Sequence, residues 1–296
     1  MDAWLPFRVD FLAESPVHIG SHDLGMIRRT RYYVPARVVW GAVTSHLSPS
    51  LAKGLVPPQM YKVTRSQVGQ CLRTTHFFPV FGGEECTPIF DPGCGLRYGR
   101  YREEALECLL VSSQTTTALA PESLTAEPGA LHETEFLSPR SRSGGKLGFR
   151  GYVILRGIEP DLVWDALAKI SVGADRHYGW GRLAMDGHPQ QQGQIFSRFR
   201  VLGWDGPDPV VEQTDVASGV PSHVIAEKEQ SSCYGDLEVV GGLDWDAGRG
   251  AGQERVENRL CWAPGSRFPA GTRFSIEPEG VWRVATGSPK TDPRRV

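Results

Sequence analysis

The segment from Val172 to Met185 (VGADRHYGWGRLAM) constrains the fold most, because its three glycines separate a helical pattern from an extended one. Upstream, residues 161–170 place apolar side chains along one stripe of a helix, and residues 183–185 resume the pattern of a strand. The predicted order is therefore helix, glycine loop, strand. This order excludes the two common nucleotide-binding loops. The chain contains no GxxxxGK followed by Ser or Thr, and GxGxxG would have to follow a strand and open a helix.

The composition of this loop is typical of a site that binds a polyanion. Glycines let backbone N–H groups approach a phosphate and tolerate positive φ, cationic side chains supply charge, and aromatic rings supply faces for base stacking. The residues that would do so are Gly173, Arg176, His177, Tyr178, Gly179, Trp180, Gly181 and Arg182. The alternative interpretation is an ordinary turn whose glycines serve tight backbone geometry alone.

The charges of the chain are distributed unevenly. The net charge is −2, yet residues 201–260 carry twelve acidic side chains against four basic ones, so the remainder of the chain is positive by six charges. Two short stretches of that remainder contain clustered cations without an acidic residue, namely Arg28, Arg29, Arg31 and Arg37, and then Arg140, Arg142, Lys146 and Arg150. Such clusters suit phosphate contacts, and solvated loops are the alternative interpretation.

The length and composition favour a folded, cytoplasmic protein. With 296 residues, 40% of them hydrophobic, the chain can bury a core in one large or two modest domains. No run of about 18 apolar residues is present, so we expect neither a membrane span nor a secretory signal. The six cysteines lie far apart without a CxxC pair, which predicts free thiols. A zinc site built from Cys71, Cys86, Cys94 and Cys108 is the alternative.

The hydrophobic pattern predicts an α+β fold. In order, it indicates a strand (7–19), a helix (34–47), an irregular insertion at about 48–130, two strands (131–139 and 146–156), a helix (161–170) and the strand after the glycine loop. The two middle strands form a predicted β-hairpin with a cationic turn. This β-α-β-β-α-β order is that of ferredoxin-like and RNA-recognition folds. We therefore expect a ferredoxin-like domain at residues 1–190 and a β-rich, acidic region at 191–296.

Two segments of the chain resemble the RAMP (repeat-associated mysterious protein) superfamily of CRISPR effector subunits. Residues 18–47 (HIGSHDLGMIRRTRYYVPARVVWGAVTSHL) look like the "hIGs" turn and the "yIPgsslwGal" helix of that superfamily. Residues 170–183 (ISVGADRHYGWGRL) look like its glycine-rich loop before the last strand. Between them, GALHETEFLSP and GFRGYVIL are similar to the paired strands of type III members. The resemblance spans about residues 7–185 and is most specific at the glycine loop.

The resemblance implies an RNA-recognition-like core that holds guide RNA in a type III effector complex of antiviral defence, and from the residues themselves we expect binding without catalysis. A type III-D-like subunit that caps the 5′ handle of the guide is the nearest match. The implied partners are the guide RNA, a large polymerase-like subunit and backbone RAMP subunits, with no cofactor and no membrane. The residues expected to contact RNA are Arg28, Arg29, Arg31, Arg37, Arg140, Arg142, Lys146, Gly173, Arg176, His177, Tyr178, Gly179, Trp180, Gly181 and Arg182.

The sequence departs from the superfamily pattern in the first loop. Backbone members usually carry an Asp for metal-assisted target cleavage in a longer loop, whereas Asp23 is the only acid here, and PARVVWG replaces the usual small-residue turn. Metal-assisted cleavage at Asp23 is therefore one alternative function. A metal-independent endoribonuclease for repeat RNA is a second, with its general acid and base drawn from His18, His22 and His177. A third is a protein-interaction module whose acidic region docks on a basic neighbour. We assign no catalytic residue and no metal ligand.

Overall fold

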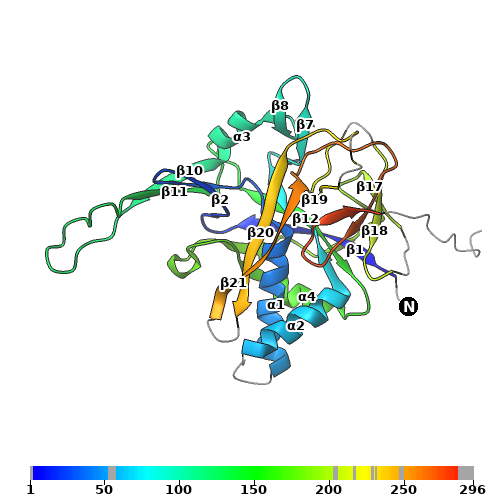
Figure 1. Ribbon diagram of the computed structural model, residues 1–296, viewed down its shortest axis with the longest axis horizontal. Helices are drawn as coiled ribbons and strands as arrows, with labels where there is room; N and C mark the ends of the chain where they lie inside the picture. The colour runs from blue at the N-terminus through cyan, green and yellow to red at the C-terminus, as the bar shows by residue number, and fades with distance from the viewer. Residues whose placement is uncertain are drawn as a thin grey trace, which may run out of the picture.

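The computed structural model describes residues 3–52, 58–202, 206–215, 218–227, 230, 232–246 and 250–285. Strands dominate these ranges, and four α-helices lie between them. The strands form two large sheets, a four-stranded sheet and a three-stranded sheet (Figure 1). Within the ranges just given, no helix combines the length and the apolar character that crossing a membrane requires.

The first large sheet is built around β1 (Leu5–Ala13). β1 pairs antiparallel with β12 (Gly148–Leu155) on one side and with β14 (Arg182–Met185) on the other. Two further strands pair antiparallel with β12, namely β4 (Leu72–Thr74) and β5 (Phe78–Phe81). The sheet is completed by the short strands β6 (Glu84–Glu85), β13 (Lys169–Ser171) and β15 (Gln190–Gln191).

The helices cover one face of this sheet. α1 (Ala36–Ala52) and α4 (Pro160–Leu167) pack against each other, and their apolar residues share a core with β1 and β12. α2 (Pro58–Cys71) packs beside α1 at the same side of the molecule (Figure 1). Along the chain, the central elements run β1, α1, β4 and β5, β12, α4, β14, which is the β-α-β-β-α-β order. The predicted α+β, ferredoxin-like fold is therefore confirmed.

The second large sheet contains the strands from residue 194 onward, in the order β16-β17-β18-β22-β23-β19-β21-β20. Their bounds are β16 (Gln194–Ile195), β17 (Phe199–Leu202), β18 (Val210–Gln213), β19 (Val224–Ile225), β20 (Leu237–Asp246), β21 (Gly250–Trp262), β22 (Arg273–Ile276) and β23 (Trp282–Val284). This part of the chain is β-rich, as predicted. It packs on the first sheet through a second core that joins Phe199 and Trp282 to Phe78 and Tyr152.

Strand β12 contributes to both cores. Phe149 and Val153 belong to the core on the helix side, whereas Tyr152 and Ile154 belong to the core shared with the second large sheet. Neighbouring residues of a strand point to opposite faces, so a strand buried on both faces needs a nearly continuous apolar run. The sequence GFRGYVIL supplies that run.

The predicted hairpin of 131–139 with 146–156 is wrong. β11 (His132–Leu137) lies in the four-stranded sheet, where it pairs with β10 (Val111–Thr116) as an extended hairpin that projects from the body (Figure 1). That sheet also contains β2 (Gly20–Leu24) and β3 (Ile27–Thr30). The second strand of the ferredoxin-like core comes instead from β4 and β5, which the sequence analysis placed in the insertion.

Burial explains why β4 and β5, and not β11, pair with β12. A strand beside β12 must be covered on both faces, and β4 and β5 are buried along almost their whole length. β11, the segment predicted for that position, is fully buried at only three of its six residues and carries two glutamates. The predicted cationic turn is present, with Arg140 bridged to Lys146 and the backbone N–H of Ser141 donating to the carbonyl oxygen of Gly145 at 2.8 Å, but it connects strands of two different sheets.

The second predicted helix is shorter than expected. α4 ends at Leu167, and Lys169–Ser171 forms strand β13, which pairs with β14 across the glycine loop. Ile170 is buried in the helix-side core, so the apolar periodicity of 161–170 extended past the end of the helix. Within the segment predicted as an irregular insertion lies α3 (Glu103–Leu110), which follows the three-stranded sheet of β7 (Pro88–Asp91), β8 (Gly95–Tyr98) and β9 (Tyr101–Arg102).

Candidate nucleic-acid interface

Two of the loop glycines close the loop onto the backbone of neighbouring segments. Gly173 and Gly181 have φ of +78° and +75°, and a Cβ atom at either position would overlap a carbonyl oxygen, that of His18 or of Val172 respectively. The backbone N–H of Gly181 also donates to the carbonyl oxygen of Pro16 at 2.6 Å. The tight-geometry interpretation is therefore correct for these two glycines, since only a residue without a side chain fits there.

The middle of the loop presents side chains to solvent. Arg176, His177 and Tyr178 form a single 3₁₀ turn between two left-handed residues, Asp175 at φ 56° and Gly179 at φ 86°. All three side chains of the turn are exposed, and Tyr178 is 75% exposed. The rings of His177 and Tyr178 lie 3.9 Å apart between centroids. The turn therefore offers a cation and two adjacent rings to an external ligand.

The loop is held against strand β11 by an aromatic contact. Trp180 is half-buried and packs edge to face on Phe136, with ring centroids 5.0 Å apart and an interplanar angle of 62°. Phe136 was not among the predicted site residues. Its signal was the alternation of HETEFL, which places Phe136 on the same face of a strand as His132 and Thr134.

Strand β3 divides the first arginine cluster between two faces of the four-stranded sheet. β3 pairs parallel with β11, and Arg28 lies opposite Thr134. Because side chains alternate along a strand, exposed Arg28 shares a face with Phe136, and Arg29 points to the other face. Trp180 packs on Phe136, so Arg28 and the glycine loop lie on the same side of this sheet. We call Arg28, Phe136, Arg176, His177, Tyr178 and Trp180 the loop surface.

Arg29 is engaged inside the fold. Its guanidinium makes ion pairs with Glu107 at 3.1 Å and with Glu135 at 3.2 Å, and it also donates to the hydroxyl of Tyr32. Burial lowers the pKa of Arg29, but the carboxylates of Glu135 and Glu107 outweigh it and leave that pKa raised. The charge that the sequence analysis assigned to RNA is balanced here by two carboxylates.

Arg31 and Arg37 also point away from the loop surface. Arg31 pairs with Glu238 of β20 and donates to the Tyr33 hydroxyl at 3.2 Å. Arg37, in the first turn of α1, pairs with Glu279 at 3.6 Å. Both arginines therefore connect the ferredoxin-like core to the second large sheet and its loops.

The cations of the 140–146 turn have different surroundings, although Arg140 and Lys146 face each other in an isolated β-bridge. Arg142 donates to the carbonyl oxygen of Val111 at 3.2 Å and lines a hollow that also contains Glu133 and Glu135. Lys146 is exposed and lines a different hollow at the edge of the first sheet. Arg140 is exposed between them. Arg182 is exposed on β14, at the end of the glycine loop. The loop surface thus contains Arg28 and Arg176 but not the other predicted arginines.

The residues of the nuclease alternatives occupy different environments. His18 is buried, and its Nδ1 donates to the carbonyl oxygen of Glu135 at 2.6 Å, which engages that ring in the fold. His22 is exposed and contacts the hydroxyl of Ser21. Asp23 is exposed and lies opposite Arg28 in the β2–β3 ladder.

Metal-ligating side chains do not gather in the part of the chain that the structure describes. Within it, no three His, Cys, Asp or Glu side chains form a group that could hold a metal ion. Cys71, Cys86, Cys94 and Cys108, the cysteines of the zinc alternative, are all described, form no such group and carry no disulfide.

Several acidic side chains of the 201–260 segment pair with arginines of this chain. Asp208 pairs with Arg73, Glu212 with Arg200 and Arg273, Glu227 with Arg283, and Glu238 with Arg31. Asp205 and Glu229 lie outside the described residues. Part of the negative charge expected to dock on a basic neighbour is therefore used within the molecule.

Comparisons with known proteins show similarity at the level of the fold. No family model and no curated protein matches the sequence. A chain in the cryo-EM structure of the Type III-B Cmr-beta bound to cognate target RNA and AMPPnP, state 1, matches with a TM-score of 0.54 and 11% identity, covering 88% of this chain and 85% of that chain. A chain of Type III-B Cmr-beta bound to cognate target RNA matches with a TM-score of 0.52 and 10% identity, covering 88% of this chain and 86% of that one. This protein therefore shares its fold with chains of type III-B CRISPR complexes.

Proposed function

We propose that this chain is a cytoplasmic, RNA-binding subunit of a type III CRISPR effector complex and holds guide RNA on the loop surface. Three findings support the proposal: the RAMP-like segments, the fold shared with chains of type III-B complexes, and the exposed cations and rings of the loop surface. We assign guide binding to the ferredoxin-like part, residues 1–190, and contacts with other subunits to the β-rich part, residues 191–296.

The observation that carries the proposal is how the loop is anchored. Gly173 and Gly181 fix both ends of the loop on backbone, and Trp180, next to Gly181, packs on Phe136. The exposed turn between these anchors is therefore preorganised, so an RNA strand would bind without ordering the loop. Phosphates would meet Arg28 and Arg176, and a base would stack on Tyr178.

The test measures RNA affinity of the purified protein by fluorescence anisotropy with a labelled repeat-derived RNA. Tyr178→Ala should weaken binding by about 1 to 3 kcal/mol, or about 5- to 150-fold in Kd, because it removes one stacking face. Arg176→Gln should reduce the slope of log Kd against log salt by about 0.7 to 0.9, because one phosphate contact is lost. Tyr234→Ala is the matched control, since Tyr234 is also exposed but lies outside the loop surface.

Two results would contradict the proposal. One is an equal loss of affinity in the Tyr178 and Tyr234 variants, which would remove the loop surface from binding. The other is a defined RNA product after incubation in EDTA that disappears in His177→Ala, which would make the protein a metal-independent nuclease.

A further inference from the structure

Strands β10 and β11 and the turn that joins them (residues 111–137) form an arm that projects from the body of the molecule (Figure 1). The outer half of this arm, residues 117–131, is exposed at every position except two half-buried alanines. None of these residues, all of which the structure describes, belongs to either core. The loop surface takes only Phe136 from the arm, at its base. The outer half is therefore available to a partner that the loop surface does not bind.

Hydrogen bonds of its own backbone order the outer half of the arm. The N–H of Glu127 donates to the carbonyl oxygen of Ala118 at 2.9 Å. The N–H of Ala120 donates to the carbonyl oxygen of Thr125, and the N–H of Leu124 donates to that of Ala120, both at 2.9 Å. These bonds carry the pairing of the two strands to the end of the arm. A partner would therefore bind the end of the arm without first having to order it.

The outer half of the arm presents large apolar side chains to solvent. Leu119 is 54% exposed, Leu124 is 74% exposed and Leu131 is 49% exposed. Leu124 also lies in the left-handed region, at φ +54°, which is unfavourable for a residue with a Cβ atom. Neither the backbone nor a core explains a leucine there. An exposed leucine held in this conformation at the end of an arm indicates a contact outside the chain.

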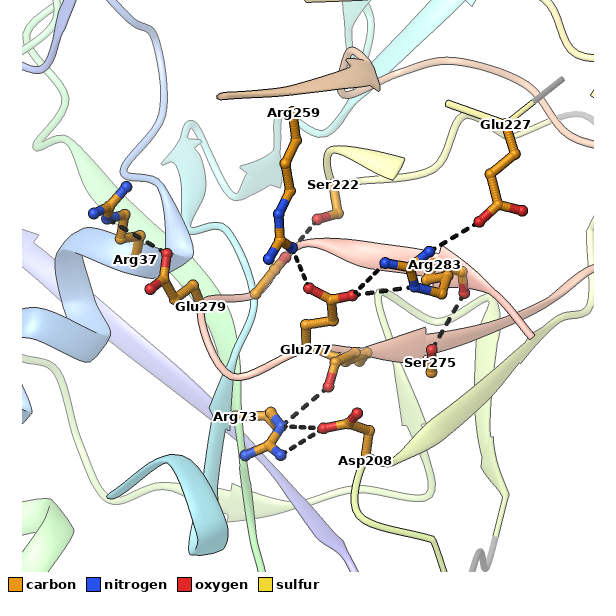
Figure 2. A network of polar contacts seen from close by, with 12 residues as sticks. Arg37, Arg73, Asp208, Ser222, Glu227, Arg259, Ser275, Glu277, Glu279 and Arg283 are labelled. Atoms are coloured by element: carbon orange, nitrogen blue, oxygen red, sulfur yellow. Dashed lines mark hydrogen bonds and ion pairs between the residues drawn. The ribbon is translucent and has the colours of Figure 1, made fainter. Parts of the chain in front are cut away.

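The charge of the arm is unsuited to a polyanion. Residues 103–139 contain seven carboxylates and neither Lys nor Arg. Glu122 and Glu127 of the outer half are exposed, and among the described residues neither side chain has an ion pair or a hydrogen bond. In the second large sheet, by contrast, several carboxylates pair with arginines of the same chain (Figure 2). The arm thus repels RNA and anionic lipids, and its carboxylates remain for cations of a partner.

We infer that the end of the arm inserts into a groove on a different protein chain, and that this groove is apolar with Lys or Arg at its rim. Leu124 would fill the groove, and Glu122 and Glu127 would face the cations of the rim. A second copy of this chain is not the occupant that we assign, because its exposed Arg28 and Arg176 belong to the loop surface. The contact is independent of RNA binding and is additional to the subunit contacts assigned to residues 191–296.

The first experiment replaces Leu124 of the full chain with the photo-crosslinker p-benzoylphenylalanine, in the cells that normally produce the protein. The same replacement of Leu162 is the matched control, since Leu162 is 54% exposed but lies on α4. After irradiation, the position 124 variant should crosslink to another protein, in a peptide that contains both apolar residues and Lys or Arg. No product above the control overturns the inference. A product with RNA, with a second copy of this chain, or with a peptide that lacks Lys and Arg also overturns it.

The second experiment titrates the purified crosslinked protein with the full chain and its variants by isothermal titration calorimetry. Leu124→Ala should weaken binding by at least about tenfold, because the buried part of a leucine side chain is lost. Glu122→Lys should weaken it by at least about fivefold, because it places a cation against the cationic rim. Asp165→Lys, a reversal of exposed charge on α4, should change it less than about twofold. Equal effects of the two charge reversals, or no effect of Leu124→Ala, overturn the inference.

RNA affinity separates this inference from the proposed function. Leu124→Ala should leave the Kd for the labelled RNA within about twofold of the native value, whereas Tyr178→Ala should raise it. A native chain that binds no RNA would contradict the proposed function and leave the crosslinking result intact. An equal loss of RNA affinity in the Leu124 and Tyr178 variants would make the arm an RNA contact and overturn the inference.

Discussion

The three glycines of the 172–185 loop are required for two different reasons. Gly173 and Gly181 combine positive φ with close approach of another backbone segment, so both the conformation and the space exclude a side chain. Gly179 also has positive φ, of +86°, but a Cβ atom there would meet no other atom within 4 Å. Identical residues in one motif therefore have different costs of substitution.

Replacement of these glycines by alanine should separate the two effects. Gly179→Ala should reduce the free energy of unfolding by about 1 to 2 kcal/mol, the usual cost of a left-handed residue with a Cβ atom. Gly181→Ala should cost more than about 3 kcal/mol, because the carbonyl of Val172 would have to move and the β13–β14 ladder lies next to it. Urea denaturation of both variants measures the difference, and equal losses would contradict the packing role of Gly181.

At the scale of elements, the alternation of side chains along β3 decides to which face of the sheet each neighbouring arginine points. Arg28 points to the face with Phe136 and is exposed, whereas Arg29 points to the face with Glu107 and Glu135 and is half-buried. The same alternation leaves one face of the four-stranded sheet for the glycine loop. One residue of sequence therefore separates a candidate RNA contact from a structural ion pair.

Arg28→Gln and Arg29→Gln should have opposite consequences. Arg28→Gln should lower RNA affinity and leave the melting temperature nearly unchanged, because an exposed surface substitution costs within about 0.5 kcal/mol. Arg29→Gln should lower stability by about 1 to 3 kcal/mol, since buried Glu135 loses a cationic partner, and should affect RNA binding less. Thermal denaturation and fluorescence anisotropy on both variants test this. A larger loss of RNA affinity in Arg29→Gln would argue for binding on the opposite face.

At the scale of the whole molecule, a chain of buried histidines joins the two large sheets. The backbone N–H of Ala36 donates to Nδ1 of His76 at 3.0 Å, so that nitrogen must accept. Nε2 of His76 then donates to Nδ1 of His223 at 3.0 Å, and Nε2 of His223 donates to Glu238 at 2.9 Å. The N–H of Ala36, at one end of this series of hydrogen bonds, thus determines the tautomer of both rings, and both rings are neutral.

The surroundings of His76, His223 and Glu238 shift the pKa of each group in the direction that keeps their hydrogen bonds. Burial lowers the pKa of His76 and of His223, although the hydrogen bond from His223 to Glu238 partly opposes the second shift. Burial alone would raise the pKa of Glu238, but the hydrogen bonds from His223 and Arg31 outweigh it and lower that pKa to about 2. Glu85 does not belong to this series of hydrogen bonds, and burial raises the pKa of its carboxyl to about 7.

Stability should therefore fall as the solution becomes mildly acidic. Below the ordinary histidine pKa of about 6.5, the unfolded chain binds protons at His76 and His223 that the folded chain excludes, and each ring that stays neutral costs at most about 1.4 kcal/mol per pH unit. Glu85 opposes one of them, because between about 4.5 and 7 the folded chain holds a proton there that the unfolded chain has lost. The net expectation is a loss of stability below about pH 6.5, with a slope of at most about 1.4 kcal/mol per pH unit.

Urea denaturation between pH 7.5 and about 5.5 measures this slope. His223→Gln should flatten it, because one excluded proton disappears, and Glu85→Gln should steepen it, because the opposing group is removed. A stability that is constant over this range, in the native protein and in both variants, would show that the histidines are not neutral and buried in solution.

Local patterns were sufficient to predict much of the fold. The apolar stripes of α1 and α4 and the extended runs of β1, β12 and β14 follow from short-range periodicity, and these elements are those of the ferredoxin-like core. The glycine loop was also recognisable, since positive φ is a requirement of the residue itself. Exposed Tyr178 and Arg176 followed from their place in that loop.

Only the tertiary structure decided which strands pair and which arginine charges are neutralised. The sequence analysis paired β12 with 131–139, whereas the structure pairs it with β4 and β5, which are buried along more of their length than β11. Arg28, Arg29 and Arg31 look alike in the sequence, but Glu107, Glu135 and Glu238 reach two of them from distant segments. The sequence by itself determined the elements with strong local periodicity, namely β1, α1, β12, α4 and β14, but not β4 and β5, which lie in the predicted irregular insertion. The tertiary structure determined which charges remain for a ligand, because the balancing carboxylates come from residues far along the chain.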